Sequence, residues 1–213
     1  MNPHTASVPS GLQHTLDAVA EMAHRSIPGA AAVSVTLVSD GGARTVAATS
    51  EWAEALDRAQ YAAGRGPCVE ASVGGEVCEM TDAGLETRWP AYAAAALATG
   101  TLSSLSMPIP IDDDGVVAAL NAFASTTDAF TAADQVAMRR LAGTAAAALT
   151  TVPIGGAPLR TRAVVDQAKG IVMSTEHCSA KQALDVLGSR AGMTGTSLLS
   201  VAEALVSEFS AAS

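Results

Sequence analysis

The chain has 213 residues, is 49% hydrophobic and carries a formal net charge of −9, a composition that indicates one or two compact domains and excludes a disordered chain. Its longest apolar stretches are rich in Ala and interrupted by Thr, Ser or Gly, so no membrane-spanning segment is predicted. Residues 1–10 lack the basic start and apolar run of a signal peptide, and we therefore expect a cytoplasmic protein.

The negative charge lies wholly in the first part of the chain. Residues 1–158 hold 7 basic and 16 acidic residues, whereas residues 159–213 hold 5 of each. A nucleic-acid-binding domain usually has a basic field, so the bulk charge argues against one. Any such activity must come from local clusters of cations.

The cysteines and acidic clusters predict neither a disulfide framework nor a metal site. Cys68, Cys78 and Cys178 are odd in number, and their spacing matches no zinc ribbon or redox pair, so we expect reduced thiols. The adjacent acids at 112–114 are typical of a solvated turn, since calcium loops need alternate spacing. His177 beside Cys178 lacks further ligands nearby.

The first half of the chain alternates between helical and extended patterns. Apolar residues at helical spacing predict a helix over Gly11–Ile27, and alternation from Val33 to Leu37 predicts a hairpin that turns at Asp40–Gly42. A second helix is expected from Glu51 to about Ala62. A loop over residues 64–67 then leads to a short strand that includes residues 77–80.

The pattern continues with a helix from Pro90 that Gly100 closes, and a strand over 105–111 whose prolines favour an edge or a bulge. The small residues of "VVAALNAFAS" predict a strand between two layers. A long helix follows over Thr131–Thr150, with Thr131 as its cap. Together these elements predict an α+β domain, an antiparallel sheet covered by helices.

The uncharged segment 151–158 contains two prolines and two glycines, which predicts a linker between a domain at 11–150 and a second domain at 159–213. Only helical patterns follow it: one from Leu159 to about Thr175, one capped by Ser179, and one that starts near Thr196. Three helices in roughly 50 residues are small for independent stability. We expect them to lean on a partner copy or on the first domain.

Two groups of motifs resemble known families. "RAVVDQAKGIVM", "AKQALDVL" and "LLSVAEALV" resemble the ANTAR domain, a three-helix RNA-binding module, over residues 159–209. Upstream, "GRGPCVEASVGGEVCEM" and "AFTAADQVAMRRLA" resemble, within residues 11–150, the GAF domain that precedes ANTAR in many actinobacterial proteins. The resemblance implies a transcription antitermination regulator: a GAF domain for sensing or dimerisation, and ANTAR helices that bind paired hairpins in leader RNA as a homodimer.

The candidate RNA-binding residues are the cations of the second domain. Arg162 and Lys169 are seven residues apart, two helical turns, so they lie on nearly the same face and both can meet phosphates. Asp166 lies between them, and an exposed ion-pair ladder is the alternative interpretation. The full set of candidates is Arg160, Arg162, Lys169, Lys181 and Arg190.

Gly188 and Ser197 stand where ANTAR modules commonly carry basic residues. Fewer cations weaken binding to a polyanion. The alternative function is therefore a ligand-sensing or protein-interaction module whose helical tail dimerises but no longer binds RNA. A further hypothesis is autoinhibition, which applies if helices of the first domain cover the cations.

A GAF domain often encloses a small molecule between its sheet and covering helices, so an unknown effector is possible, although no cofactor or metal is predicted. The aromatic and Met candidates for lining such a cavity are Trp89, Tyr92, Met107 and Phe123. Cys68 is expected to be a buried thiol rather than an attachment site for a chromophore. The sequence contains no catalytic motif, so we predict that the protein is not an enzyme.

Overall fold

The computed structural model describes residues 9–39, 42–111, 117–150 and 160–211. The strands are β1 (Ala32–Ser39), β2 (Gly42–Ala48), β3 (Cys78–Met80), β4 (Ser103–Ile109) and β5 (Val117–Ala124). The helices are α1 (Ser10–Ser26), α2 (Glu51–Ala63), α3 (Pro67–Gly74), α4 (Pro90–Thr99), α5 (Ala132–Leu149), α6 (Arg160–Glu176), α7 (Ala180–Thr194) and α8 (Leu198–Ala211). The predicted linker at 151–158, the acids at 112–114 and the turn residues 40–41 lie outside the described residues.

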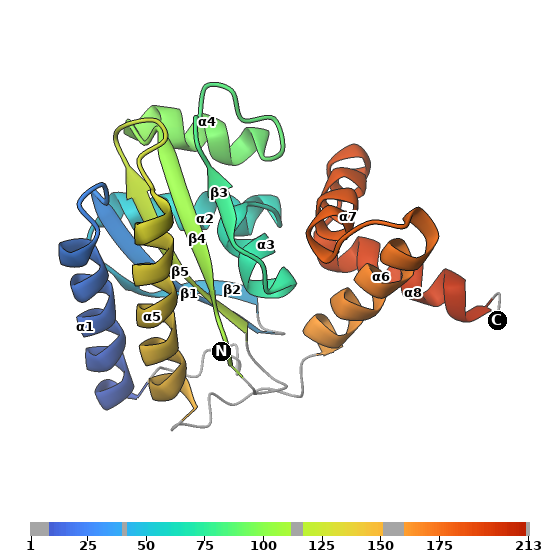
Figure 1. Cartoon of the computed structure of the whole chain (residues 1–213), viewed down its shortest axis with the longest axis horizontal. Helices are drawn as coiled ribbons and strands as arrows, with labels where there is room; N and C mark the ends of the chain where they lie inside the picture. The colour runs from blue at the N-terminus through green and yellow to red at the C-terminus, as the bar shows by residue number, and fades with distance from the viewer. Residues whose placement is uncertain (1–8, 40–41, 112–116, 151–159, 212–213) are drawn as a thin grey trace, which may run out of the picture.

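The strands form one antiparallel sheet in the order β2-β1-β5-β4-β3, with helices on both faces, as predicted (Figure 1). β5 lies at its centre: Leu120 pairs with Val35 of β1 and with Met107 of β4. Every residue of β5 is buried, because helices cover both of its faces. The prediction of a strand between two layers is confirmed.

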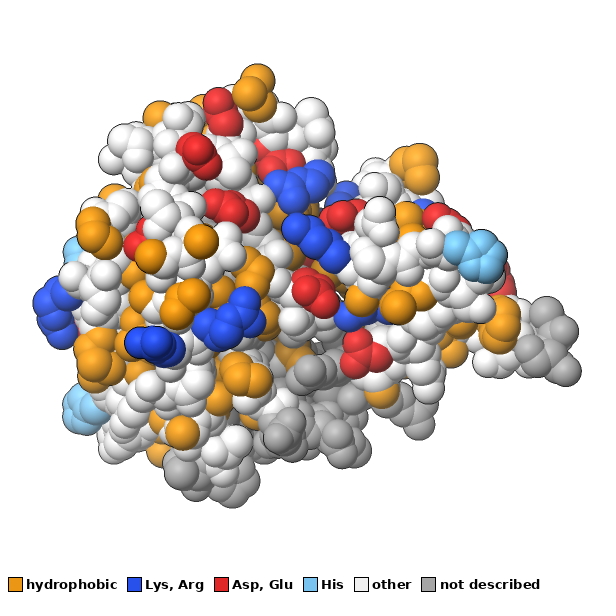
Figure 2. Space-filling model, viewed as in Figure 1, with side chains coloured by type: hydrophobic (Ala, Val, Ile, Leu, Met, Phe, Trp, Pro, Cys, Tyr) orange, Lys and Arg blue, Asp and Glu red, His pale blue; other side chains and the backbone are white. Residues whose placement is uncertain are grey.

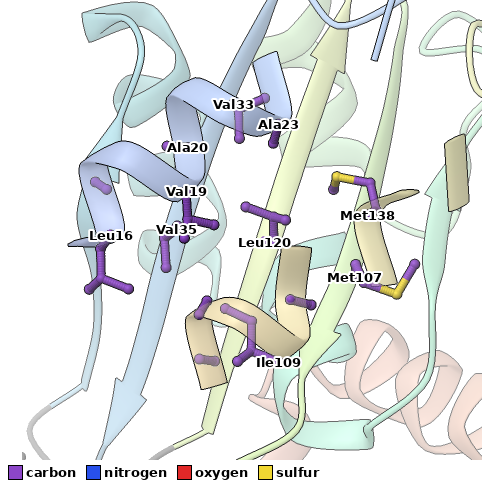
Figure 3. Packing of buried hydrophobic residues seen from close by; sticks show 14 of the residues in the cluster. Leu16, Val19, Ala20, Ala23, Val33, Val35, Met107, Ile109, Leu120 and Met138 are labelled. Atoms are coloured by element: carbon purple, nitrogen blue, oxygen red, sulfur yellow. The ribbon is translucent and has the colours of Figure 1, made fainter. Parts of the chain in front are cut away.

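One face of the sheet packs against α1 and α5. Leu16 and Val19 of α1 meet Leu120 of β5 and Met138 of α5 in one apolar cluster (Figure 3). The hydroxyl of Thr131 accepts a hydrogen bond from the Asp134 N–H, and the Asp134 side chain accepts one from the Thr131 N–H. This capping box satisfies two N–H groups at the start of α5 and confirms the predicted cap.

The opposite face packs against α2, α3 and α4. The helix α3 is a difference from the sequence-based expectation, which continued the loop at 64–67 toward the strand. Pro67 suits the first turn of a helix because its φ is already helical and its missing N–H needs no partner there. Gly75 ends α3 with φ 69°, a left-handed conformation that favours glycine.

The expectation that the prolines favour an edge or a bulge holds in part: β4 lies between β5 and β3 over Ser104–Ser106, but beyond Ser106 only β5 pairs with it. Pro108 is nevertheless tolerated. β3 is short, and its pairing with β4 ends at Ser106, so Pro108 pairs only with Ala119 of β5.

The helices α6, α7 and α8 form a separate bundle beside α3 (Figure 1). Ser179 caps α7 through a capping box with Gln182, which confirms the predicted cap. The apolar cluster of the bundle includes Leu184 and Leu187 and extends to Val73 of α3 and Val117 of β5. We expected these helices to pack against a partner copy or against the first domain. In the structure they pack against the first domain of the same chain. Among the described helices, none is both long and apolar enough to span a membrane.

Candidate functional site

Lys169, the central cation of the candidate RNA surface, faces the first domain. Its ammonium donates a hydrogen bond of 2.8 Å to the carbonyl oxygen of Gly74, at the end of α3, and lies 3.4 Å from a carboxylate oxygen of Asp166. Lys169 is only 8% exposed. The sequence analysis named Asp166 as an ion-pair partner but had no signal for Gly74, which is 95 residues away in the chain.

The face of α7 that lies against the first domain carries two glycines, four residues apart. A Cβ on Gly192 would lie 2.4 Å from Nη1 of Arg65, and a Cβ on Gly188 would lie 3.1 Å from Nη2 of Arg65. Arg65 forms an ion pair of 3.2 Å with Glu70, whose other contact is a hydrogen bond of 2.8 Å from the Trp89 indole N–H. The missing basic side chain at 188 therefore coincides with the place that Arg65 occupies.

Burial dominates the electrostatics of this ion pair. Both side chains are largely withdrawn from solvent, and burial raises the pKa of Glu70 although Trp89 and Arg65 act to lower it. Sequence reasoning missed Arg65, Glu70 and Gly192. The acid three residues after "GRGP" could have indicated an ion pair between Arg65 and Glu70. No neighbouring residue in the sequence indicates that this pair contacts α7.

A cavity of about 400 Å³ opens at this junction (Figure 2). Arg65, Glu70 and Arg88 line it from the first domain, and Asp185 and Ser189 line it from α7. Two basic and two acidic side chains line its wall, so its net charge favours neither an anion nor a cation.

The other candidate cations differ in their surroundings. Lys181 is exposed near the start of α7, and Arg190 forms an ion pair of 2.8 Å with Glu176 on the surface of the bundle. Arg160 and Arg162 belong to the first turn of α6, and their side chains lie outside the described part of the chain. The structure therefore brings neither Lys181 nor Arg190 to the contact that Lys169 makes with Gly74.

The five-stranded sheet carries a buried polar network that the sequence analysis did not single out. Nδ2 of Asn121 donates to the side chains of Ser34 and Thr36 at 3.1 and 3.0 Å, and lies 3.5 Å from Oδ1 of Asp57. The Thr45 hydroxyl donates to Oδ2 of Asp57 at 2.9 Å. Burial is the main reason that the pKa of Asp57 is raised to about 7. The alternation of Ser34 and Thr36 with Val33 and Val35 was the available signal.

The four proposed cavity residues do not share one site. Trp89, Tyr92 and Phe123 belong to the cluster beneath α2, α3 and α4, whereas Met107 lies in the cluster beneath α1 and α5 (Figure 3). Because these clusters lie on opposite faces of the sheet, a single cavity lined by all four residues is not formed. Two of the four, Trp89 and Tyr92, together line a smaller cavity of about 170 Å³ at the junction with α7.

The cysteines are free thiols in the structure. Burial raises the pKa of the Cys68 thiol well above its ordinary value, and that of Cys78 to about 12, so both favour the neutral form. Cys178 is partly exposed. Among the described residues, His, Cys, Asp and Glu form no group of three or more that could hold a metal ion.

Comparison with solved structures shows similarity to GAF domains and related folds. A type II free methionine-R-sulfoxide reductase from Thermoplasma acidophilum is 15% identical, with a TM-score of 0.54 over 66% of this chain and 94% of that one. The GAF domain region of a membrane protein from Geobacter sulfurreducens is 18% identical, with a TM-score of 0.54 over 67% and 95%. A domain of a two-component sensor histidine kinase protein from Sinorhizobium meliloti is 14% identical, with a TM-score of 0.51 over 70% and 95%. At these identities the likeness shows the fold alone.

Comparison with curated proteins finds no match. Comparison with family models finds a GAF domain over residues 9–150 and an ANTAR domain over residues 157–206. The GAF family is one of sensing or dimerisation domains and the ANTAR family one of RNA-binding antitermination modules, so both family models describe regulatory domains. The chain therefore belongs to the GAF domain family and, through its second domain, to the GAF–ANTAR regulators.

Proposed function

We propose that this chain binds hairpins of leader RNA as a homodimer and prevents transcription termination. The observation that carries the proposal is the ANTAR match over residues 157–206, which coincides with the three-helix bundle α6–α8. The GAF domain, with limits at about 11–150, would sense a small-molecule effector or hold two chains together. The segment 151–158 would link it to the ANTAR domain at 159–213.

The proposed contacts are electrostatic. We assign them to Arg160, Arg162, Lys169, Lys181 and Arg190, which are all the cations of the second domain. Each cation that neutralises a phosphate releases a counterion, so affinity falls as salt rises. The only aromatic residue after the linker is Phe209, which argues against stacking on unpaired bases and in favour of recognition by hairpin shape and phosphates.

A dimer would compensate for the small number of cations. When one module of a dimer has bound its hairpin, capture of the second hairpin becomes intramolecular and occurs at a high effective concentration. A signal that changes the separation of two ANTAR domains would therefore change the affinity for a paired-hairpin RNA without changing any contact.

The test is a titration of the full chain with a two-hairpin leader RNA between 50 and 200 mM salt. We expect affinity to fall linearly on a log–log scale, and Lys181→Ala to reduce the slope by about 0.7–0.9. Arg139→Ala, which removes an exposed cation from α5, is the matched control and should leave the slope unchanged. Absence of binding at the lowest salt, by dimeric protein with its fold intact, would refute the proposal.

The second candidate function is a sensing or protein-interaction module that no longer binds RNA. Gly188 favours it, because the position that commonly holds a cation is instead packed against Arg65 and Glu70. This candidate predicts a dimer that binds no structured RNA at any salt concentration and whose stability does not change when RNA is added. The same titration therefore separates the two.

A further inference from the structure

The contact between the two domains uses residues from both that fit only at close approach. Gly74 of α3 meets Leu184 of α7: a Cβ on Gly74 would lie 2.4 Å from Cδ2 and 2.9 Å from Cδ1 of Leu184. Gly188 and Gly192 meet Arg65 in the same way from the side of α7. These three helical glycines all have ordinary negative φ angles, so their backbone conformation does not require glycine.

Space explains these glycines better than local structure does. Glycine is the poorest helix former apart from proline, yet Gly188 and Gly192 lie inside α7. Each stands where a side chain would meet the guanidinium of Arg65. Their small size therefore serves the close packing of α7 against the first domain rather than α7 itself.

The ammonium of Lys169 completes the contact. The carbonyl of Gly74 lies at the C-terminal end of α3, where helix carbonyls lack intrahelical partners and carry partial negative charge. Lys169 fills this acceptor at 2.8 Å, and an ammonium held there is not available to a phosphate. Val73 and Val117 add an apolar part that is continuous with the core of the bundle.

We propose that this contact is an autoinhibitory lock: the GAF domain holds the ANTAR domain closed through Arg65, Glu70 and Gly74, and RNA binds only after the two separate. This regulation rests on the proposed function. The affinity of the full chain for RNA then equals that of the open state reduced by the fraction of open molecules. A signal that weakens the contact releases Lys169 and thereby increases RNA binding.

The closed state can be measured without RNA, because the chain has only two lysines, Lys169 and Lys181. An acetylating reagent followed by mass spectrometry gives the reaction rate of each. Lys181 is exposed and serves as the internal reference. We expect Lys169 of the full-length protein to react at least about tenfold more slowly than Lys181, since it reacts only from the open state. Equal rates would overturn the proposal.

Gly188→Glu tests the lock by the sign of its effect. The position of its Cβ lies 3.1 Å from Nη2 of Arg65 and 3.2 Å from a carboxylate oxygen of Glu70, so the bulk of the new side chain opens the contact, while its charge is attracted by Arg65 and repelled by Glu70. An added negative charge should weaken binding to a polyanion. The lock predicts the opposite: RNA affinity rises by the same factor as the rate of Lys169 acetylation.

The matched control is Ser174→Glu, which adds the same charge at an exposed position of α6. It should leave Lys169 protected and RNA affinity unchanged or lower. Gly74→Val opens the contact from the first domain without adding charge, by forcing a side chain against Leu184, and should act as Gly188→Glu does. Circular dichroism of each variant verifies that both domains remain folded.

The outcomes separate this proposal from the proposed function. Two results would overturn the lock without touching the proposed function. In the first, Lys169 stays protected from acetylation in both Gly188→Glu and Gly74→Val although these variants are folded. In the second, Lys169 becomes reactive but RNA affinity does not change. If Lys169 becomes reactive in the variants but none of the proteins binds RNA, the proposed function is refuted. Control of RNA binding by the contact is then refuted with it. Equal gains in acetylation rate and RNA affinity support both.

Discussion

Replacement of Asp57 by Asn should stabilise the GAF domain at neutral and alkaline pH. The carboxylate of Asp57 is fully buried and is hydrogen-bonded by two hydroxyls, those of Ser34 and Thr45, and by the amide of Asn121. No cation lies in direct contact with it among the residues the structure describes. Burial therefore disfavours the charged form, and the pKa rises from 3.8 to about 7. An amide has the same shape and carries no charge at any of these pH values.

The direction and size of the effect follow from proton linkage. Between pH 3.8 and about 7 the folded protein retains a proton on Asp57 that the unfolded chain has released. The unfolded state then binds fewer protons, so the free energy of unfolding falls as the pH rises through this window. At about 1.4 kcal/mol per pH unit, the full loss is on the order of 4 kcal/mol above pH 7. Asp57→Asn abolishes this loss.

The assay is denaturant unfolding at pH 5, 6, 7 and 8, followed by tryptophan fluorescence, which reports the GAF domain because Trp52 and Trp89 are the only tryptophans of the chain. The free energy of unfolding of the variant, relative to that of the parent protein, should rise by roughly 2 kcal/mol between pH 5 and pH 7, with little further change at pH 8. All other titrating groups are the same in the two proteins and cancel. A stability difference that is constant across this range would refute the reasoning.

Thr131→Ala removes the capping box of α5 and should lower the free energy of unfolding by about 1 kcal/mol in the same assay, whereas Thr144→Ala, on the exposed side of α5, should have little effect; equal losses would contradict the role of the cap. A thiol reagent at pH 7.5 should modify Cys178 at least about tenfold faster than Cys68 or Cys78, since both latter thiols are buried with raised pKa values. Mass spectrometry of the partly modified protein measures the order, and early modification of Cys68 would show that the GAF core opens readily.

Local signals in the sequence were sufficient for most of the fold. Apolar spacing located the helices other than α3 to within about two residues at the ends that were predicted, because each buries one stripe, as α1 does through Leu16 and Val19. Thr131 and Ser179 were identifiable as caps because the hydrogen bonds they accept come from three residues ahead. Strand β5 was predicted to lie between two layers because small residues occur on both of its faces.

The errors concern positions that are decided by distant segments. Periodicity places Met107 on one face of its strand but does not say which layer of helices covers that face. In the structure Met107 lies on the other face of the sheet from Trp89 and Phe123. Burial of Lys169 depends on the Gly74 carbonyl, a backbone group that has no signature in the sequence. Gly188 was interpreted as a lost cation, although the structure assigns it a packing partner, Arg65.

The distribution of charge gives a second reason why separation of the domains should favour RNA. Residues 1–158 carry an excess of 9 acidic residues, whereas residues 159–213 are neutral in sum. In the closed arrangement the RNA-binding domain lies beside a domain of net negative charge, and an approaching transcript meets the repulsion of that domain. Screening by physiological salt acts over about 8 Å, so moving the GAF domain away by more than this distance removes most of the repulsion. Opening would then release Lys169 and weaken the unfavourable field together, and the two effects can be distinguished because the acetylation rate of Lys169 reports only the first.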